Sequence, residues 1–174
     1  MLDEFGGLAI DSPARCEAMI QHHLMDRLGT KPRMYVPDVD RPDTEKAASE
    51  YAQLVADGGL DLTLLGLGAN GHIGMNEPGS TAGSEARVVE LAKETGEHAV
   101  EAYGSDHTPT WGITLGMRPI LESAEIWLLV TGAHKSETLA AALHSPIGPD
   151  IPATYLRNHP NLTILADEEA AAQL

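Results

Sequence analysis

Apolar runs alternate along the chain with helical patterns and with segments rich in glycine or proline. Two runs, residues 60–65 and 125–130, are almost continuously apolar, which is typical of strands buried on both faces of a parallel sheet. Shorter strands are predicted at residues 86–91, 112–115 and 162–165. Helices are predicted between the strands, at residues 12–28, 44–56, 118–122, 134–143 and 153–158.

Two of these helices begin with capping signals. Ser12 followed by Pro13 fits an N-cap with proline at the first helical position, and Asp43 is placed to cap the second helix. The proline-containing segment 31–41 is predicted to be extended or irregular, and the polar segment 92–107 fits neither pattern.

The order of elements predicts the fold class. Strand, loop and helix repeat along the chain, so we expect one α/β domain over residues 1–174, with a doubly wound, mostly parallel sheet and helices on both faces. In such Rossmann-like folds, ligands bind beyond the carboxyl ends of the strands. Residues that follow positions 65 and 130, and those near Met1, are therefore candidates for a site.

Composition excludes several classes of function. The formal charge of −15 repels nucleic acid and anionic membranes, so neither is expected as a partner, whereas a few placed cations can still bind a small phosphate. The start of the chain has no pattern of a signal peptide, and no run is long enough to span a membrane. With Cys16 as the single cysteine, a reducing compartment is expected, and we predict the cytoplasm.

The candidate chemistry is concentrated in residues 65–80, LGLGANGHIGMNEPGS. This stretch follows the predicted strand 60–65 and places Asn70, His72 and Glu77 among five glycines. An imidazole beside a carboxylate can both accept and donate a proton, so catalysis or substrate contact is the favoured interpretation. The alternative is that the residues around Glu77 only stabilise the turn at Pro78.

The glycines also match the dinucleotide fingerprint G-x-G-x-x-G, at Gly66, Gly68 and Gly71. That fingerprint needs a helix that opens at the last glycine, so that the pyrophosphate sits on its N-terminus. Here the sequence NEPGSTAG follows, which predicts a loop. We therefore do not favour a nucleotide cofactor.

Other polar residues have ordinary explanations when judged alone. Asp3 and Glu4 fit a solvated terminus, and Lys135 fits a surface lysine, although it follows a strand in a place that suits phosphate. The remaining histidines show no spacing typical of metal ligands, so no metal site is expected. Trp111 and Trp127 are predicted to lie in the core.

The sequence GLGANGHIGMNEPG resembles the signature of the glucosamine-6-phosphate and galactosamine-6-phosphate deaminase/isomerase family, which shares its fold with 6-phosphogluconolactonases. The resemblance continues through residues 112–116, 128–135, 151–156 and 167–168 and back to residues 1–7, so it covers essentially the whole chain. Lactonases generally lack the Asn-Glu-Pro that follows the glycine–histidine turn here. The deaminase branch is therefore favoured.

The resemblance implies a role for each candidate residue. Asp3 matches the carboxylate that moves a proton between C2 and C1 of the sugar, and His72 matches the acid/base that opens the ring, assisted by Glu77. Asn70 stands where some members have aspartate, so it can orient a partner by hydrogen bonds but adds no charge. Lys135 matches a phosphate-binding lysine. The implied partner is a small sugar phosphate, and no metal or organic cofactor is implied.

Two departures from the family pattern are visible. Members carry additional N-terminal residues that form the first strand and a glycine-rich phosphate loop, so the resemblance implies an N-terminally truncated chain without a central strand. Glucosamine-type enzymes have a phosphate-binding arginine in the segment that matches residues 98–103, where this chain has none and has Glu101. This difference favours galactosamine 6-phosphate. The alternative functions are a lactonase and a non-catalytic sugar-phosphate sensor. The protein is also a candidate for a homo-oligomer.

Overall fold

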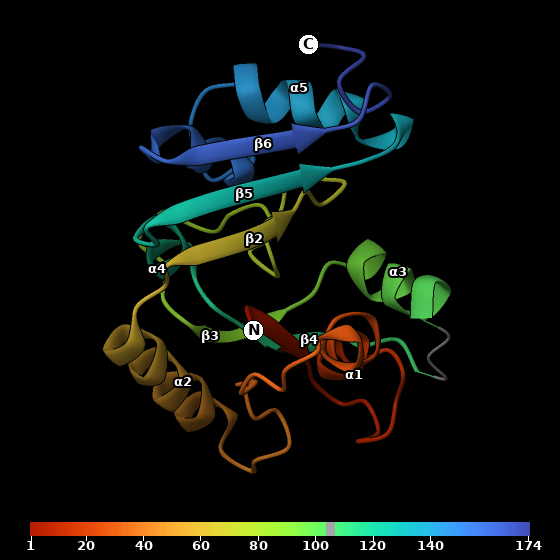
Figure 1. The fold of residues 1–174 in the computed structure, drawn as a ribbon, viewed down its shortest axis with the longest axis vertical. Helices are drawn as coiled ribbons and strands as arrows, with labels where there is room; N and C mark the ends of the chain where they lie inside the picture. The colour runs from red at the N-terminus through yellow and green to blue at the C-terminus, as the bar shows by residue number, and fades with distance from the viewer. Residues whose placement is uncertain (104–106) are drawn as a thin grey trace. The chain divides into compact units, whose positions relative to one another are not determined.

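The structure is a computed structural model of residues 1–174, and it describes all of them except residues 104–106 and the side chains of residues 102 and 103. Its contacts divide the chain into two compact units. The first unit comprises Met1–Tyr51 and Ala86–Thr114, and the second comprises Ala52–Glu85 and Leu115–Leu174 (Figure 1). The single domain expected over residues 1–174 stays a prediction.

The first unit contains a three-stranded antiparallel sheet. Its strands are β1 (Asp3–Phe5), β4 (Trp111–Thr114) and β3 (Arg87–Glu90), in the order β1-β4-β3. Strand β4 is central: Asp3 on one side and Arg87 on the other are both in register with Thr114. The predicted strand segments 86–91 and 112–115 are confirmed. Their antiparallel pairing was not predicted, because strand direction depends on which segments meet in the fold.

The helices of the first unit begin with α1 (Cys16–His23) and the short 3-10 helix η1 (Met25–Arg27). Helix α2 (Thr44–Gly58) starts as predicted, since Asp43 Oδ1 accepts the Lys46 N–H at 3.0 Å, and it continues into the second unit. The segment 92–107, which fitted neither pattern, contains α3 (Lys93–Tyr103), and its residues 104–106 lie outside the described part. An apolar cluster consists of Val39, Ala47, Ala48 and Ile113, with Val88 and Trp111 packed against it.

The predicted start of the first helix is wrong. Helix α1 begins at Cys16, with Arg15 at the N-cap, rather than at Ser12. Ser12 instead forms a turn: its hydroxyl accepts the Ala14 N–H at 3.3 Å, and its carbonyl accepts the Arg15 N–H at 3.2 Å. The sequence signal fails because the acceptors for the first N–H groups of α1 come from β1, which is remote in sequence.

The second unit contains a parallel sheet of β2 (Leu62–Gly66), β5 (Glu125–Val130) and β6 (Leu162–Ala166), in the order β2-β5-β6. Helix α4 (Met117–Leu121) precedes β5. The connection from β5 to β6 contains η2 (Ala133–Lys135), α5 (Ser136–His144) and η3 (Pro152–Asn158). The predicted helix at residues 153–158 is thus a 3-10 helix. A parallel sheet with helical crossovers confirms the predicted α/β class.

The parallel sheet is buried on one face. Ile126, Leu128 and Val130 of β5 are buried, whereas the intervening Trp127 and Leu129 expose 37% and 45% of their surface. Strand side chains alternate between faces, so this pattern places Trp127 and Leu129 on a second, exposed face. The predictions that β5 is buried on both faces and that Trp127 lies in the core are therefore wrong.

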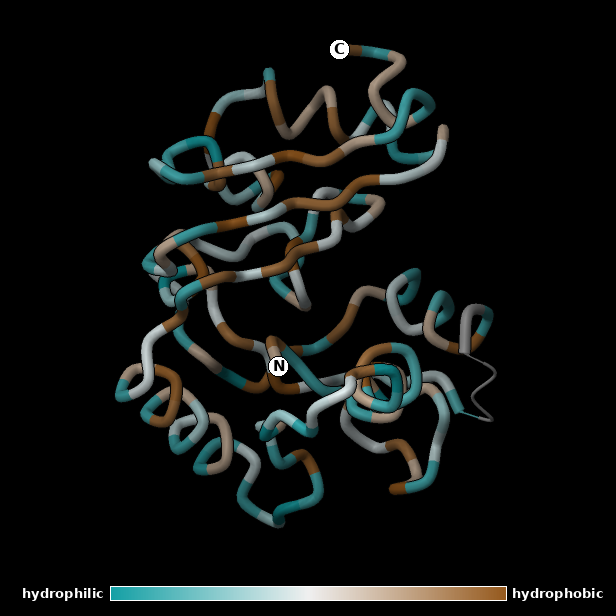
Figure 2. Tube along the Cα trace, viewed as in Figure 1, coloured by the Kyte–Doolittle hydropathy of each residue, from teal (hydrophilic) through white to brown (hydrophobic). Residues whose placement is uncertain are grey.

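The neighbouring strands extend this exposed face. Leu64 is in register with Trp127 and exposes 54% of its surface, and Leu165, in register with Leu129, exposes 48%. Figure 2 shows hydrophobic residues along all three strands. Burial of β2 on both faces is thus also a wrong prediction, because an apolar run does not reveal whether both faces are covered. Among the described residues, no helix is long and apolar enough to cross a membrane.

Candidate functional site

The loop after β2 brings Asn70, His72 and Glu77 together. Oε2 of Glu77 lies 3.3 Å from Nδ1 of His72 and accepts a hydrogen bond from Asn70 Nδ2 at 2.8 Å. Asn70 Oδ1 in turn accepts the backbone N–H of His72 at 3.1 Å. The side chains of His72 and Glu77 expose 20% and 14% of their surface, so both are largely shielded but reachable. The predicted cluster of these three residues is thus present in the structure.

Two glycines explain why the chain can make this turn. A Cβ at residue 68 would lie 2.2 Å from Cδ2 of His72, so the imidazole packs directly against the Gly68 backbone. Gly71 has a φ of 83°, in the left-handed region that side chains disfavour, and a Cβ there would also lie 2.5 Å from Cγ2 of Ile151. Gly68 therefore allows the imidazole to pack against the backbone, and Gly71 allows the chain to turn beside Ile151.

The loop is also tied to its surroundings by polar contacts. Asn76 is fully buried, and its Nδ2 donates to the carbonyls of Ile73 at 3.0 Å and Leu115 at 2.9 Å. Thr138 of α5 donates its hydroxyl to the Ala69 carbonyl at 2.8 Å. Asn76 lies within the motif that the sequence singles out, but Thr138 carries no sequence signal. These contacts fix the loop at Ala69 and Asn76, and they thereby restrict the position of His72 between them.

Lys135 lies in η2, directly after β5, as the sequence predicts. It is partly buried, and burial lowers the pKa of its ammonium group. A group whose charge is poorly solvated gains from an anion nearby, so this position suits a phosphate. The preceding turn is held by Asp167, which is not among the site residues predicted from the sequence.

Asp167 follows β6 and accepts hydrogen bonds from two parts of the chain. Its Oδ1 and Oδ2 lie 3.1 Å and 2.9 Å from the Gly132 nitrogen, and Oδ1 accepts the Ala170 N–H at 2.7 Å. These backbone donors, Ala170 first and then Gly132, lower the pKa of the Asp167 carboxyl. Its place beyond the carboxyl end of a parallel strand is the signal that could have identified it.

Asp3 belongs to the first unit, unlike the other candidates. It is the first residue of β1, is partly buried and is in register with Thr114. The structure therefore brings Asn70, His72 and Glu77 together in the second unit, where Lys135 also lies, and it places Asp3 on the antiparallel sheet of the first unit. The reading of residues 3 and 4 as a solvated terminus is wrong for Glu4, which is fully buried.

The contacts of His72 define what it can do chemically. With Glu77 facing Nδ1, the favoured neutral tautomer carries its proton on Nδ1, which leaves a lone pair on Nε2. The carboxylate stabilises the imidazolium that forms when Nε2 takes a proton. The arrangement can therefore accept and return a proton at Nε2. Within the described part of the chain, no three His, Cys, Asp or Glu side chains form a group that could hold a metal ion.

Comparison with known proteins identifies the family. The family model of glucosamine-6-phosphate isomerases/6-phosphogluconolactonase matches residues 7–165. The chain belongs to this family. Its membership confirms the resemblance carried by the glycine-rich signature.

Individual members of the family are similar over nearly the whole chain. The glucosamine-6-phosphate deaminase of Rhodopirellula baltica is 39% identical over 176 residues, which cover 99% of this chain and 70% of that protein. The solved structure of a monomeric glucosamine-6-phosphate deaminase is 36% identical with a TM-score of 0.93, and the match covers 99% of this chain and 73% of that one. This chain is thus shorter than both relatives, as the sequence predicts.

The lactonase branch is more distant. The structure of 6-phosphogluconolactonase from Trypanosoma brucei has a TM-score of 0.74 but is 22% identical, over 100% of this chain and 73% of that one. At this identity the likeness shows a shared fold only. Within the family, the similarity in sequence therefore points to the deaminase branch.

Proposed function

We propose that this protein is an amino-sugar-6-phosphate deaminase/isomerase that converts glucosamine 6-phosphate and water to the ketose 6-phosphate and ammonia. The observation that carries the proposal is the hydrogen-bonded cluster of Asn70, His72 and Glu77 in a chain of this family. The relatives that are 39% and 36% identical are glucosamine-6-phosphate deaminases, which favours glucosamine over galactosamine 6-phosphate. Galactosamine 6-phosphate, which the missing arginine favours, is the alternative substrate that the assay below includes.

In the first step, His72 opens the pyranose ring. It takes the proton of the anomeric hydroxyl and delivers a proton to the ring oxygen, which breaks the bond between C1 and that oxygen. Glu77 stabilises the charged imidazolium during this transfer, and Asn70 holds Glu77 and the His72 backbone in place. Lys135 binds the phosphate, which restores a favourable environment for its ammonium group.

In the second step, Asp3 removes the proton from C2 and returns it to C1. O1 of the open-chain aldehyde takes up a proton as the C2 proton leaves, which gives an enolamine, and the amino nitrogen gives up a proton as C1 is reprotonated, which gives a C2 imine. Water adds to this imine, and ammonia leaves to give the ketose. Each proton that is removed is returned, so the reaction needs no redox partner. The free, buried Cys16 fits a reducing compartment, and we place the reaction in the cytoplasm.

The proposal is tested by product analysis. The protein is incubated with glucosamine 6-phosphate, galactosamine 6-phosphate and 6-phosphogluconolactone, and ammonia, ketose and acid are measured. We expect ammonia and ketose in equal amounts from an amino sugar. His72→Gln should remove this activity, whereas His144→Gln, which changes an exposed histidine on α5, should not.

The same assay distinguishes a lactonase and a sugar-phosphate sensor from a deaminase. Hydrolysis of the lactone without ammonia release identifies a lactonase and overturns the proposal. Binding of the sugar phosphates without any product identifies a sensor, and it also overturns the proposal. The assay on both amino sugars decides which C4 epimer is the substrate. A homo-oligomer stays a prediction.

A further inference from the structure

Glu4 is a fully buried carboxylate that the proposed reaction does not use. It lies on β1 directly after Asp3, and its side chain exposes 0% of its surface. A carboxylate in such a place keeps its charge only if hydrogen-bond donors replace the water that it has lost. Its partners therefore indicate how the fold accommodates a carboxylate here.

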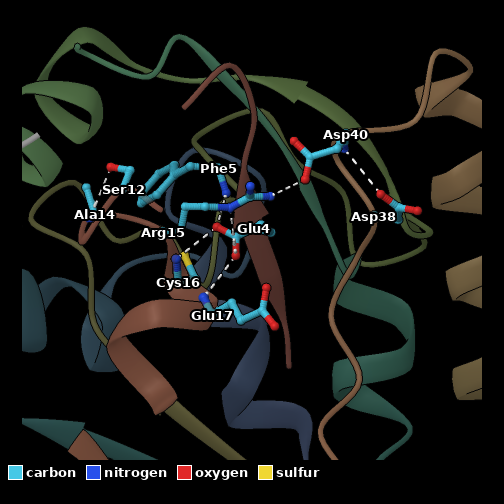
Figure 3. A network of polar contacts seen from close by, with 9 residues as sticks. All are labelled: Glu4, Phe5, Ser12, Ala14, Arg15, Cys16, Glu17, Asp38 and Asp40. Carbon is cyan, nitrogen blue, oxygen red and sulfur yellow. Dashed lines mark hydrogen bonds and ion pairs between the residues drawn. The ribbon is translucent and has the colours of Figure 1, made fainter. Parts of the chain in front are cut away.

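The partners of Glu4 are at the start of α1. Its Oε1 accepts the N–H groups of Phe5 and Cys16, each at 2.8 Å, and its Oε2 accepts the N–H of Glu17 at 2.9 Å. Arg15 adds a positive charge, with its Nε 3.9 Å from Oε2. Figure 3 shows the Glu4 carboxylate between the β1 strand and the first turn of α1.

These contacts replace a local cap. The first N–H groups of a helix have no partner within the helix, and a side chain at the N-cap usually accepts one of them. Arg15 stands at the N-cap of α1 and makes no such bond. Glu4 supplies the acceptors instead, and the positive end of the helix dipole favours its charge. Strand β1 and helix α1 are thereby joined through one side chain.

Cys16 connects this junction to Asp3. Its backbone N–H binds Glu4, and its thiol forms a side-chain hydrogen bond with Asp3. The pKa of the Cys16 thiol is raised, first by burial and then by the nearby charges of Asp3 and Glu4. The first residue of α1 therefore contacts both carboxylates of β1.

We propose that Glu4 is a positioning residue: by holding the start of α1 against β1, it fixes the place of the Asp3 carboxylate. The inference rests on the proposed function, in which Asp3 moves the proton between C2 and C1. A base that abstracts a carbon-bound proton depends on its distance and angle to that proton. Loss of Glu4 should therefore affect turnover more than substrate binding.

The test compares Glu4→Gln with Glu17→Gln. Both remove one carboxylate near the start of α1, but the Glu17 side chain is exposed and Glu4 binds only its backbone N–H. A glutamine at position 4 offers one acceptor oxygen, and its amide group would face an N–H donor. Each variant is assayed below its thermal midpoint. If Glu4→Gln does not fold, Glu4→Asp takes its place under the same criteria.

Two measurements separate positioning from stability. The first is the rate at which a thiol reagent labels Cys16, the single cysteine, because this rate reports opening of the junction. The second is kcat and KM for ammonia release from glucosamine 6-phosphate. For Glu4→Gln we expect labelling that is about tenfold faster and a kcat that is lower by on the order of 100-fold, with KM changed by less than about threefold. Glu17→Gln should change neither.

Several results would overturn the proposal. One is a kcat of Glu4→Gln equal to that of Glu17→Gln although Cys16 labels faster, since Glu4 would then serve stability alone. Another is unchanged labelling, since Glu4 would then not hold the junction.

Failure of the proposed function is recognised separately. If the wild type releases no ammonia, that function fails, and the carbon-13 resonance of the Asp3 carboxyl decides the role of Glu4. Placement of Asp3 by Glu4 then requires that Glu4→Gln shifts this resonance and Glu17→Gln does not.

Discussion

The Nδ1 atom of His72 lies 3.3 Å from Oε2 of Glu77, and Asn70 donates to the same oxygen at 2.8 Å. One carboxylate oxygen therefore orients the imidazole and is itself oriented by an amide. The hydrogen-bonded side chains give the loop after β2 groups that can take part in acid/base chemistry, which its glycines cannot provide. This relationship also indicates that a substitution of Glu77 should lower kcat without a comparable change in KM.

Glu77→Gln should lower kcat for ammonia release by about 100-fold, because an amide does not stabilise the imidazolium as a carboxylate does. KM should change little if Lys135 and the loop backbone remain in place. The matched control is Glu122→Gln, whose carboxylate exposes 69% of its surface and lies 3.9 Å from Arg118 Nε. Equal kcat values for the two variants would show that Glu77 does not contribute to the reaction.

Gly68→Ala should damage the same site by steric means. The added Cβ would lie 2.2 Å from Cδ2 of His72, so the ring must shift from the position in which its Nδ1 faces Glu77. We expect kcat to fall on the order of 100-fold, as for other small displacements of reacting groups. Gly66→Ala is the control in the same stretch, because a Cβ there meets no atom within 4 Å. Full activity of Gly68→Ala would show that the ring tolerates the displacement.

Two neighbouring leucines of β2 test the one-sided burial of the parallel sheet. Leu65 exposes 3% of its surface and Leu64 exposes 54%. Leu65→Ala should lower the free energy of unfolding by about 2–5 kcal/mol, since it leaves a cavity, whereas Leu64→Ala should cost less than about 1 kcal/mol. Urea denaturation of both variants measures the difference. Equal, large losses would mean that both faces of β2 are covered in solution.

The raised pKa of Tyr51 predicts how the free energy of unfolding changes at alkaline pH. Burial, with a smaller contribution from the charge of Asp3, raises the pKa of Tyr51 to about 12 from its ordinary value of 10.0. The unfolded state then loses the phenolic proton at lower pH than the folded state, so stability is complete below pH 10 and declines as pH rises towards 12.

The loss attributable to Tyr51 should be on the order of 2 kcal/mol between these pH values. Tyr51→Phe should therefore flatten the decline in the free energy of unfolding, measured by urea denaturation at several pH values. Tyr35→Phe, which changes an exposed tyrosine, is the control. An unchanged slope in Tyr51→Phe would contradict the assignment.

The sequence by itself determined the α/β class, most strand positions and the clustering of Asn70, His72 and Glu77. These features follow from local patterns: apolar runs define strands, and a glycine-rich loop keeps Asn70 and Glu77, seven positions apart, within reach of one another. Asp43 likewise predicted the start of α2, because its cap lies within one turn of the helix.

Only the tertiary structure decided features that depend on distant partners. It moved the start of α1 to Cys16, because Glu4 rather than Ser12 accepts the first N–H groups. It left Trp127 and Leu64 on an exposed face, because an apolar run specifies a strand but not what covers it. It also buried Glu4 between β1 and the start of α1. The contacts of this side chain depend on how the strand and the helix pack together, which the local sequence does not specify.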